Sequence, residues 1–236
     1  MISIIIPVLN EATTIVSLLD YIITTTKPEN IINIIVVDGG SNDGTQNLVK
    51  LFSEKNKKVQ LLTSDKGRAK QMNAGARQTK GSVLYFLHAD SIPPKHFDTY
   101  IIKEIQQGNV AGCFKMKFDS NHWWLTLASW LTKFKWRACR GGDQSLFITR
   151  KLFNEIGGYD ENFKIYEDNI LINELYKRKQ FTVIQKWIVT SARLYEKVGI
   201  WKLQYYFWTI YVKRWFGASA DDIYRYYLKK IALSQV

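Results

Sequence analysis

The sequence predicts an α/β protein built on a mostly parallel sheet with helices on both of its faces. Short apolar runs rich in β-branched residues, typical of strands buried on both sides, alternate with segments whose apolar residues recur every three or four positions. Parallel strands need crossover helices of this kind between them. In the first hundred residues the expected strands are 2–9, 31–37, 59–63 and 83–87.

Each of these strands is followed by a segment with helical spacing. These helices are expected around residues 15–23, 48–52, 68–79 and 97–107. Beyond residue 107 the regular alternation ends, and we expect strands over 110–118, 145–149 and 181–189 with helices over 123–136, 169–177 and 201–227. Residues 1–200 are expected to form one domain, and residues 201–236 a helical, aromatic and basic C-terminal extension that packs on it.

The composition is that of a globular protein with a large excess of positive charge. The formal net charge is +12, which predicts attraction to nucleic acid, an anionic membrane surface or a phosphorylated small molecule. Cys113 and Cys139 lack metal-type spacing and are expected to be reduced, packed thiols. With neither a signal-peptide pattern nor an apolar run of about 18–20 residues, we expect a cytoplasmic protein.

Polar residues gather where the predicted parallel strands end. The buried run 82–87 stops at His88-Ala89-Asp90, Asn10-Glu11 follows the first strand, and Asp38 closes the second. The carboxyl ends of parallel strands meet at one edge of the sheet, which is where open α/β sheets bind ligands. Each segment alone would also suit an ordinary turn or helix cap. Together they predict a nucleotide pocket with a divalent cation held by Asp90.

A basic segment precedes the third helix. Lys66-Gly67-Arg68 and Lys70 surround its start, and helix N-terminal amides and arginine side chains both favour a diphosphate. A solvated basic turn would have the same composition. No Gly-x-Gly-x-x-Gly follows the first strand and no phosphate-loop lysine motif occurs, which argues against dinucleotide-binding proteins and ATPases.

The order of these motifs resembles that of the family-2 glycosyltransferases of the GT-A fold, a Rossmann-like α/β type. The segments that carry the resemblance are Ile-Pro-Val-Leu-Asn-Glu (6–11), Val-Val-Asp-Gly-Gly-Ser-Asn-Asp-Gly-Thr (36–45), the Asp-x-Asp-type motif (88–90), Gly142-Asp143-Gln144, Gly157-Gly158-Tyr159, Glu167-Asp168 and Ser191-Ala192-Arg193. They cover about residues 1–200. The resemblance implies a metal-dependent enzyme of the hexosyltransferase type, which moves a sugar with inversion from a nucleotide-diphosphate donor, UDP-sugar favoured, to an unknown acceptor hydroxyl.

The resemblance also implies roles for single residues. Those expected to contact the donor are Pro7, Asn10, Glu11, Asp38, Gly67, Arg68, Asn73, Ala89 and Arg193. Asp90 would hold a Mg²⁺ or Mn²⁺ ion that bridges the donor phosphates. His88 stands where the family usually has aspartate, so it either ligates a softer ion such as Mn²⁺ or leaves the metal to bond the ribose or a water. The second alternative is favoured.

The expected general base is one of two adjacent carboxylates, Glu167 and Asp168. Inverting transfer needs a base to take the proton of the acceptor hydroxyl, and we expect Asp168 in that role with Glu167 as second choice. Two acids at a helix start would equally complement the helix dipole. Asp143 and Gln144 are expected to orient the acceptor or the base, although Asp143 also suits a plain turn.

The segment Ser191-Ala192-Arg193-Leu194-Tyr195-Glu196 is similar to the Ser-Ala-Arg-Arg-Trp-Glu motif of one subgroup and departs from it at Leu194 and Tyr195. Arg193 is expected to reach the diphosphate, or else to pair with Glu196 at helical spacing. The missing second arginine removes a bidentate role at position 194.

Two aromatic segments, 123–136 and 201–216, are flanked by Lys and Arg. They fit helices that lie in a membrane interface, which would suit a lipid or isoprenoid acceptor and place the protein at the inner face of the membrane. Core packing or a homodimer face is the alternative. Core packing is favoured for the first segment, whose stripe includes Trp123, Leu127 and Trp130, and the two interpretations are balanced for the second.

Other classes of function fit less well. A sugar-phosphate nucleotidyltransferase would also need a nucleotide and a metal, but it usually begins with a Gly-rich loop that is missing here. A non-catalytic, transferase-like module that binds a nucleotide would share the pocket. Nucleic acid is not an expected partner, because the basic residues are scattered rather than arranged in a recognition motif.

Overall fold

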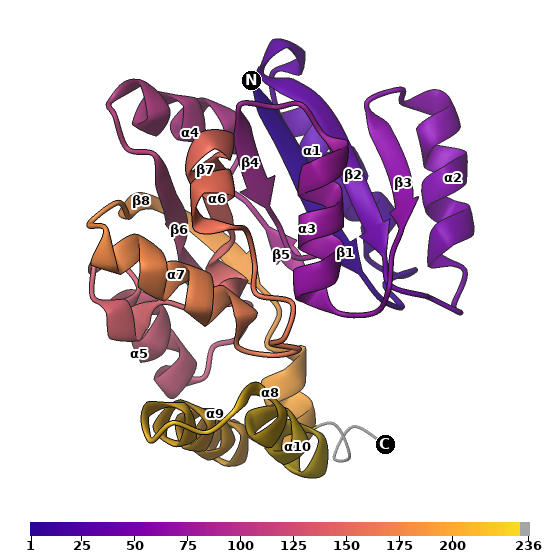
Figure 1. The fold of residues 1–236 in the computed structure, drawn as a ribbon. Coiled ribbons are helices and arrows are strands. Elements are labelled where there is room, and N and C mark those ends of the chain that lie inside the picture. The colour runs from indigo at the N-terminus through magenta and orange to yellow at the C-terminus, as the bar shows by residue number, and fades with distance from the viewer. Residues whose placement is uncertain (232–236) are drawn as a thin grey trace.

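A computed structural model describes residues 1–231, in which an eight-stranded sheet is flanked by helices on both faces (Figure 1). The predicted α/β class is confirmed. The strands are β1 (Ile2–Val8), β2 (Ile31–Asp38), β3 (Val59–Thr63), β4 (Val83–Phe86), β5 (Ser91–Ile92), β6 (Ala111–Phe118), β7 (Leu146–Thr149) and β8 (Thr182–Thr190). The sheet order is β3-β2-β1-β4-β7-β6-β8-β5.

The first four strands are parallel, as the alternation of strands and helices predicts. β7 then runs antiparallel to both β4 and β6, whereas β8 is parallel to β6. The helices are α1 (Ile15–Thr25), α2 (Thr45–Lys55), α3 (Arg68–Gln78), α4 (Phe97–Gln106), α5 (Trp123–Leu131), α6 (Arg150–Ile156), α7 (Glu167–Lys177), α8 (Arg193–Val198), α9 (Ile200–Trp215) and α10 (Ala220–Lys230). The sequence patterns did not predict β5, α6 or α8.

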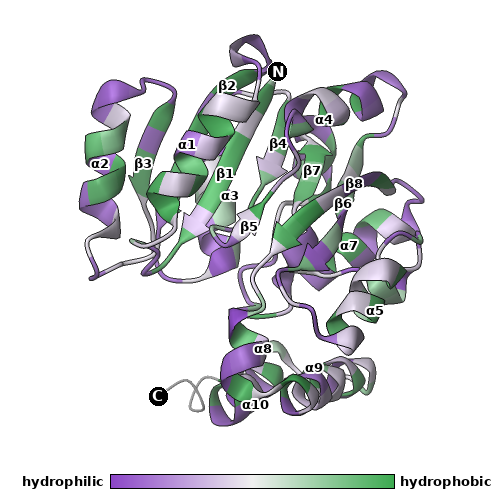
Figure 2. Cartoon of the chain, turned by 180° about the vertical axis from the view of Figure 1, so that it is seen from behind, coloured by the Kyte–Doolittle hydropathy of each residue, from purple (hydrophilic) through white to green (hydrophobic). Residues whose placement is uncertain are grey.

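Alternate residues of the central strands pack into two cores, one on each face, and in Figure 2 these strands are almost continuously hydrophobic. Ile4 and Ile6 of β1 face α1, α2 and α4, while Ile5 faces α3, α6 and α7. A strand covered on both faces needs apolar residues at every position. This explains why these strands appear in the sequence as unbroken apolar runs.

β4 ends early because its neighbour β1 contains a proline. The N–H of Leu87 still donates to the carbonyl of Ile5 at 3.0 Å. The next bond of a parallel ladder would need the N–H of Pro7, which proline lacks. β4 therefore ends at Phe86, and residues 88–90 leave the sheet at its carboxyl edge.

The helix expected over 123–136 ends at Leu131. The Thr132 hydroxyl accepts the N–H of Met116, and the Ser129 hydroxyl accepts that of Phe118, so the polar side of α5 is bound to the edge of β6. The prediction that the aromatic stripe of this helix packs in the core is wrong. Trp123 is 61% exposed and Trp130 47% exposed, because the opposite side of α5 faces the sheet.

The segment 201–227 forms two helices rather than one. Gly217 adopts φ +88°, a left-handed conformation that suits glycine, and it separates α9 from α10. Ser219 then begins α10 with a capping box that includes Asp222. Together α8, α9 and α10 lie beyond the carboxyl edge of the parallel strands (Figure 1).

The C-terminal helices contact the remainder of the chain through aromatic and polar side chains. The indole N–H of Trp124 donates to Gln204 at 3.1 Å, and the rings of Tyr166 and Tyr211 meet edge to face. The proposed boundary at residue 200 stays a prediction, and residues 232–236 of that extension lie outside the described residues. Over residues 1–231, none of the helices has the length and hydropathy of a membrane span.

Candidate active site

Asp38 is completely buried at the end of β2. Its Oδ1 accepts hydrogen bonds from the N–H groups of Gly40 and Ser41 and from the side-chain amide of Gln46, at 2.8–2.9 Å. Burial opposes the charge, but the bonds from Ser41, Gly40 and Gln46 hold the pKa of Asp38 below its usual value. The carboxylate is therefore ionised, and its Oδ2 is buried without a partner among the described residues.

The loop after β1 is attached to the loop after β2. Asn10 donates its N–H to the Ser41 hydroxyl and accepts the N–H of Asn42 on its side-chain oxygen. The N–H of Glu11 donates to Thr45 at 3.0 Å. Asn10 and Glu11 thus lie beside Asp38, as predicted, but the side chain of Asn10 is used to hold these two loops together.

The chain segments after β1 and β8 meet at the rim of the site. Arg193 Nη2 lies 3.3 Å from Glu11 Oε1, although 182 positions separate the two residues. Arg193 therefore pairs with Glu11 in the structure. The alternative prediction, an ion pair with Glu196 at helical spacing, is wrong. The Glu11 carboxylate also accepts the Thr14 hydroxyl at 2.9 Å, which fixes its position at the start of α1.

Arg68 and Glu167 form an ion pair between the first residues of α3 and α7, with Nε to Oε1 at 3.0 Å. Glu167 is fully buried and Arg68 half-exposed. Burial raises the pKa of Glu167 to about 7. The positive charge of Arg68 opposes this rise, whereas the negative charge of Asp168 adds to it. Glu167 and Asp168 together raise the pKa of Arg68, so its guanidinium is always charged. Glu167 thus holds Arg68 at the mouth of the site.

Asp143 brings a further carboxylate to this region from a short 3₁₀ turn. Although its side chain is exposed, it lies within the site, where desolvation raises its pKa. His88 and Arg68 oppose this shift, while Asp90 and Asp168 increase it. Groups from the segment after β4, from α3 and from α7 are therefore close enough to act on one carboxyl group.

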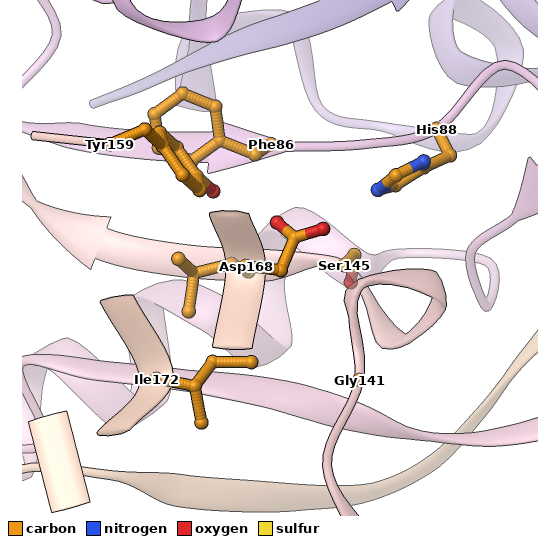
Figure 3. A pocket seen from close by; sticks show the side chains of 8 residues that line it. Phe86, His88, Gly141, Ser145, Tyr159, Asp168 and Ile172 are labelled. Atoms are coloured by element: carbon orange, nitrogen blue, oxygen red, sulfur yellow. The ribbon is translucent and has the colours of Figure 1, made fainter. Parts of the chain in front are cut away.

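Asp168 lies on the wall of a small cavity of about 10 Å³, which is room for about one water molecule. In Figure 3 the ring of His88 and the hydroxyl of Tyr159 point toward its carboxylate from opposite sides. Gly141 and Ser145 also line the cavity. Whether His88 binds a metal stays a prediction.

Several residues predicted to bind ligands are used to build the fold in this structure. Both amide hydrogens of Asn73 are donated, to the carbonyl of Tyr159 and to Glu161. Gln144 is buried, and its amide donates to the carbonyl of Cys139 at 2.6 Å. Pro7 and Ala89 are buried. Gly67 adopts φ +139° where α3 begins.

Sequence reasoning missed two residues of this region. Arg140 is buried and donates to the carbonyls of Thr132 and Phe134, so it holds the segment that leads to Asp143. No sequence pattern marks a buried arginine whose partners are backbone carbonyls. Tyr159 stands in the Gly-Gly-Tyr motif, which indicated the family and gave no role to its hydroxyl.

The residues at the end of β4 suit a metal ion that is shared with a substrate. In the described part of the chain, no three His, Cys, Asp or Glu side chains form a group that could hold a metal ion by themselves. Mg²⁺ is usually bound by one or two carboxylates together with substrate phosphates. Asp90 is partly exposed at this edge, and its side chain accepts a long 3.4 Å bond from the Ser91 hydroxyl. This donor set fits an ion that arrives with a diphosphate.

The fold is that of the GT-A glycosyltransferases, to judge from solved structures with similar backbones. TarS of S. aureus bound to UDP-GlcNAc superposes with a TM-score of 0.67 and 18% identity, covering 80% of this chain and 58% of that one. The mannosyltransferase PcManGT of Pyrobaculum calidifontis, in complex with GDP-Man and Mn²⁺, gives a TM-score of 0.64 and 19% identity. The match covers 80% of this chain and 56% of that one.

The model of the glycosyl transferase family 2 matches residues 3–171, and the chain belongs to this family. Glycosyltransferase AglE of Haloferax volcanii is 36% identical over 94 residues, which are 39% of this chain and 31% of that protein. The probable glycosyltransferase YdaM of Bacillus subtilis is 26% identical over 196 residues, which are 74% of this chain and 46% of that protein. The chain thus spans less than half the length of these two relatives. A PGL/p-HBAD biosynthesis glycosyltransferase of Mycobacterium bovis is 30% identical to this chain. The match covers 71% of this chain and 66% of that protein.

Proposed function

We propose that this family-2 glycosyltransferase moves a sugar with inversion from a UDP-sugar to an acceptor hydroxyl, with the help of a divalent metal ion. The observation that carries the proposal is that Asp38 closes and Asp90 follows parallel strands ending at one edge of the sheet, while Asp168 lines a cavity with His88, two residues before Asp90. The three carboxylates come from β2, from the end of β4 and from the start of α7. These positions allow one carboxylate for the nucleoside, one for a metal and one for the acceptor.

The donor would lie along the carboxyl ends of β1, β2 and β4. The ionised Asp38 would accept hydrogen bonds from the base or the ribose, and Arg68, held by Glu167, would turn its outer nitrogens to the diphosphate. UDP is favoured because TarS binds UDP and UDP-GlcNAc with a similar fold. PcManGT, which binds GDP-Man, is the reason to test other nucleotides as well.

Asp168 would act as the general base. As the acceptor oxygen attacks the anomeric carbon, the bond from that carbon to the diphosphate oxygen breaks on the opposite side, and the acceptor proton passes to Asp168. Asp168 lines the cavity, whereas Glu167 is enclosed and ion-paired. The second-choice base would thus hold Arg68 instead. A Mg²⁺ or Mn²⁺ ion held by Asp90 would stabilise the charge on the departing diphosphate.

Donor binding can be tested by thermal shift with a panel of UDP-, GDP- and dTDP-sugars, each with and without Mn²⁺. A ligand at about 100 times its dissociation constant stabilises the folded state by about 2.7 kcal/mol, which in a chain of this size raises Tm by roughly 5–10 °C. We expect this rise for a UDP-sugar together with Mn²⁺. The absence of any shift across the panel would contradict the proposed function, and a shift with GDP-sugars alone would correct the nucleotide.

We also propose a lipid-linked acceptor, reached from the inner face of a membrane. Support comes from the aromatic surface, which we define as Trp123 of α5 and, in the α9 region, Trp201, Trp208, Trp215 and Phe216. Trp215 and Phe216 are 84% and 83% exposed. Tryptophan is typical of membrane interfaces, and the net charge of +12 suits anionic lipids.

The protein is accordingly expected to co-float with vesicles of anionic phospholipid. The double variant Trp215→Ala/Phe216→Ala should lower the bound fraction about tenfold or more, because two large apolar side chains no longer enter the interface. Leu51→Ala on α2, where the side chain is 58% exposed, is the matched control and should change nothing. Failure to float, with a concentration-dependent dimer in size-exclusion chromatography, would favour the homodimer alternative.

A further inference from the structure

The hydroxyl of Tyr159 is a buried polar group for which the fold provides no partner. The residue is 3% exposed, and its oxygen has no hydrogen-bond partner among the described residues. Buried hydroxyls are nearly always paired, because leaving one unpaired is costly. The cavity that this hydroxyl faces is lined by Asp168 and His88 (Figure 3). An unpaired donor next to the candidate base requires an explanation.

The remainder of Tyr159 is held firmly. Asn73 binds its peptide from both sides, accepting the N–H and donating to the carbonyl, each at 2.9 Å. The ring packs edge to face on Phe86 with centroids 5.0 Å apart, and Phe153 covers it at 5.8 Å. Gly158 must be glycine here, because a Cβ would come within 2.8 Å of the Asn73 oxygen. These contacts fix the direction in which the hydroxyl points.

The surroundings keep this hydroxyl protonated. Burial raises the pKa of Tyr159 well above its usual value, and the charges of Asp168 and Glu167 raise it further, against a smaller effect of Arg68. The phenol is therefore a hydrogen-bond donor at neutral pH, and the Asp168 carboxylate is an acceptor. The cavity between them has room for about one water molecule.

We infer that Tyr159 is a positioning residue, whose hydroxyl donates a hydrogen bond to the Asp168 carboxylate, directly or through one water in the cavity. This bond occupies one carboxylate oxygen and turns the other toward the acceptor hydroxyl. The inference rests on the proposed role of Asp168 as base. It also gives the Asn73 amide a purpose within the site, since Asn73 holds the peptide that carries this donor.

The test is Tyr159→Phe, which keeps the ring packing and removes only the hydroxyl. We expect kcat to fall about ten- to a hundredfold, as when a group that orients a functional side chain is lost, with the donor KM unchanged within about twofold. Tyr21→Phe is the matched control, because its hydroxyl donates to the carbonyl of Pro93 at 2.8 Å, outside the cavity. It should leave kcat unchanged.

The double variant Tyr159→Phe/Asp168→Asn separates positioning from general damage. If the hydroxyl acts through Asp168, adding Tyr159→Phe to Asp168→Asn lowers kcat no further. Independent, multiplicative losses, or an unchanged kcat in Tyr159→Phe beside an inactive Asp168→Asn, would overturn the positioning role alone. Full turnover in Asp168→Asn would instead reject the proposed base.

A crystal structure that resolves ordered water gives a second measurement, which does not depend on activity. The Tyr159 oxygen, or a water bound to it, is expected within about 3.2 Å of an Asp168 oxygen. A hydroxyl more than about 3.5 Å from the carboxylate with no bridging water would overturn the inference.

Discussion

Replacing Asp168 by asparagine is expected to lower sugar transfer about 10²–10⁴-fold, while the donor binds as it does to the unchanged protein. The amide has nearly the same shape as the carboxylate, but it cannot take the proton of the acceptor hydroxyl. Asp168 lines the cavity and is 9% exposed, so the substitution leaves the packing around α7 in place. Initial rates of transfer, beside the thermal shift produced by the donor, measure the two effects separately.

Glu174→Gln is the control for this variant, since it removes a carboxylate from the same helix at the surface, where Glu174 pairs with Arg178. It should transfer sugar at the normal rate. Turnover retained by Asp168→Asn would show that another group takes the proton. Glu167 is poorly suited to replace it, because it is fully buried and its carboxylate already holds Arg68.

Asp90→Ala is expected to remove the Mn²⁺-dependent part of nucleotide-sugar hydrolysis, with a loss of about a hundredfold or more. Stabilisation of a departing diphosphate by a metal ion is worth several kcal/mol, and Asp90 is the only carboxylate that directly follows β4. The measurement is UDP release at a series of Mn²⁺ concentrations, with a chelator as the zero-metal reference.

Asp65→Ala provides the comparison for Asp90→Ala, because Asp65 is an exposed carboxylate before α3 that pairs with Lys70. Its hydrolysis should depend on Mn²⁺ as in the unchanged protein. An Asp90→Ala variant with the same metal dependence would reject the metal assignment and leave Asp143 as the next carboxylate to test.

The strands, and the sheet edge at which the candidate residues gather, could be predicted because both depend on local patterns. A strand covered on two faces needs a run of apolar residues, and the polar residues after it must lie at the strand end. Asp38 and Asp90 were found in this way, whereas Asp168 was found from its place before a helical pattern and from the family resemblance; the roles of all three remain predictions. Contacts between distant segments leave no such local pattern.

Three differences show what local patterns could not contain. The partner of Arg193 is Glu11, which only the arrangement of β1 and β8 brings near. Asn73 was assigned to the donor through the family resemblance, whereas its amide is used on the loop that carries Tyr159. The stripe of α5 was assigned to the core because it is apolar, but Ser129 and Thr132 bind the edge of β6 and turn the tryptophans outward.

The contact between Glu11 and Arg193 also has a consequence for folding. It joins residues 182 positions apart, so this side of the candidate site cannot form until β8 and α8 have reached the sheet. Contacts of such high contact order form late, because a long loop must be closed first. A chain still emerging from the ribosome could already pair β1 with β2, yet it would lack the contact between Glu11 and Arg193. If the proposed donor site is right, tight donor binding would thus be reserved for chains that have finished folding.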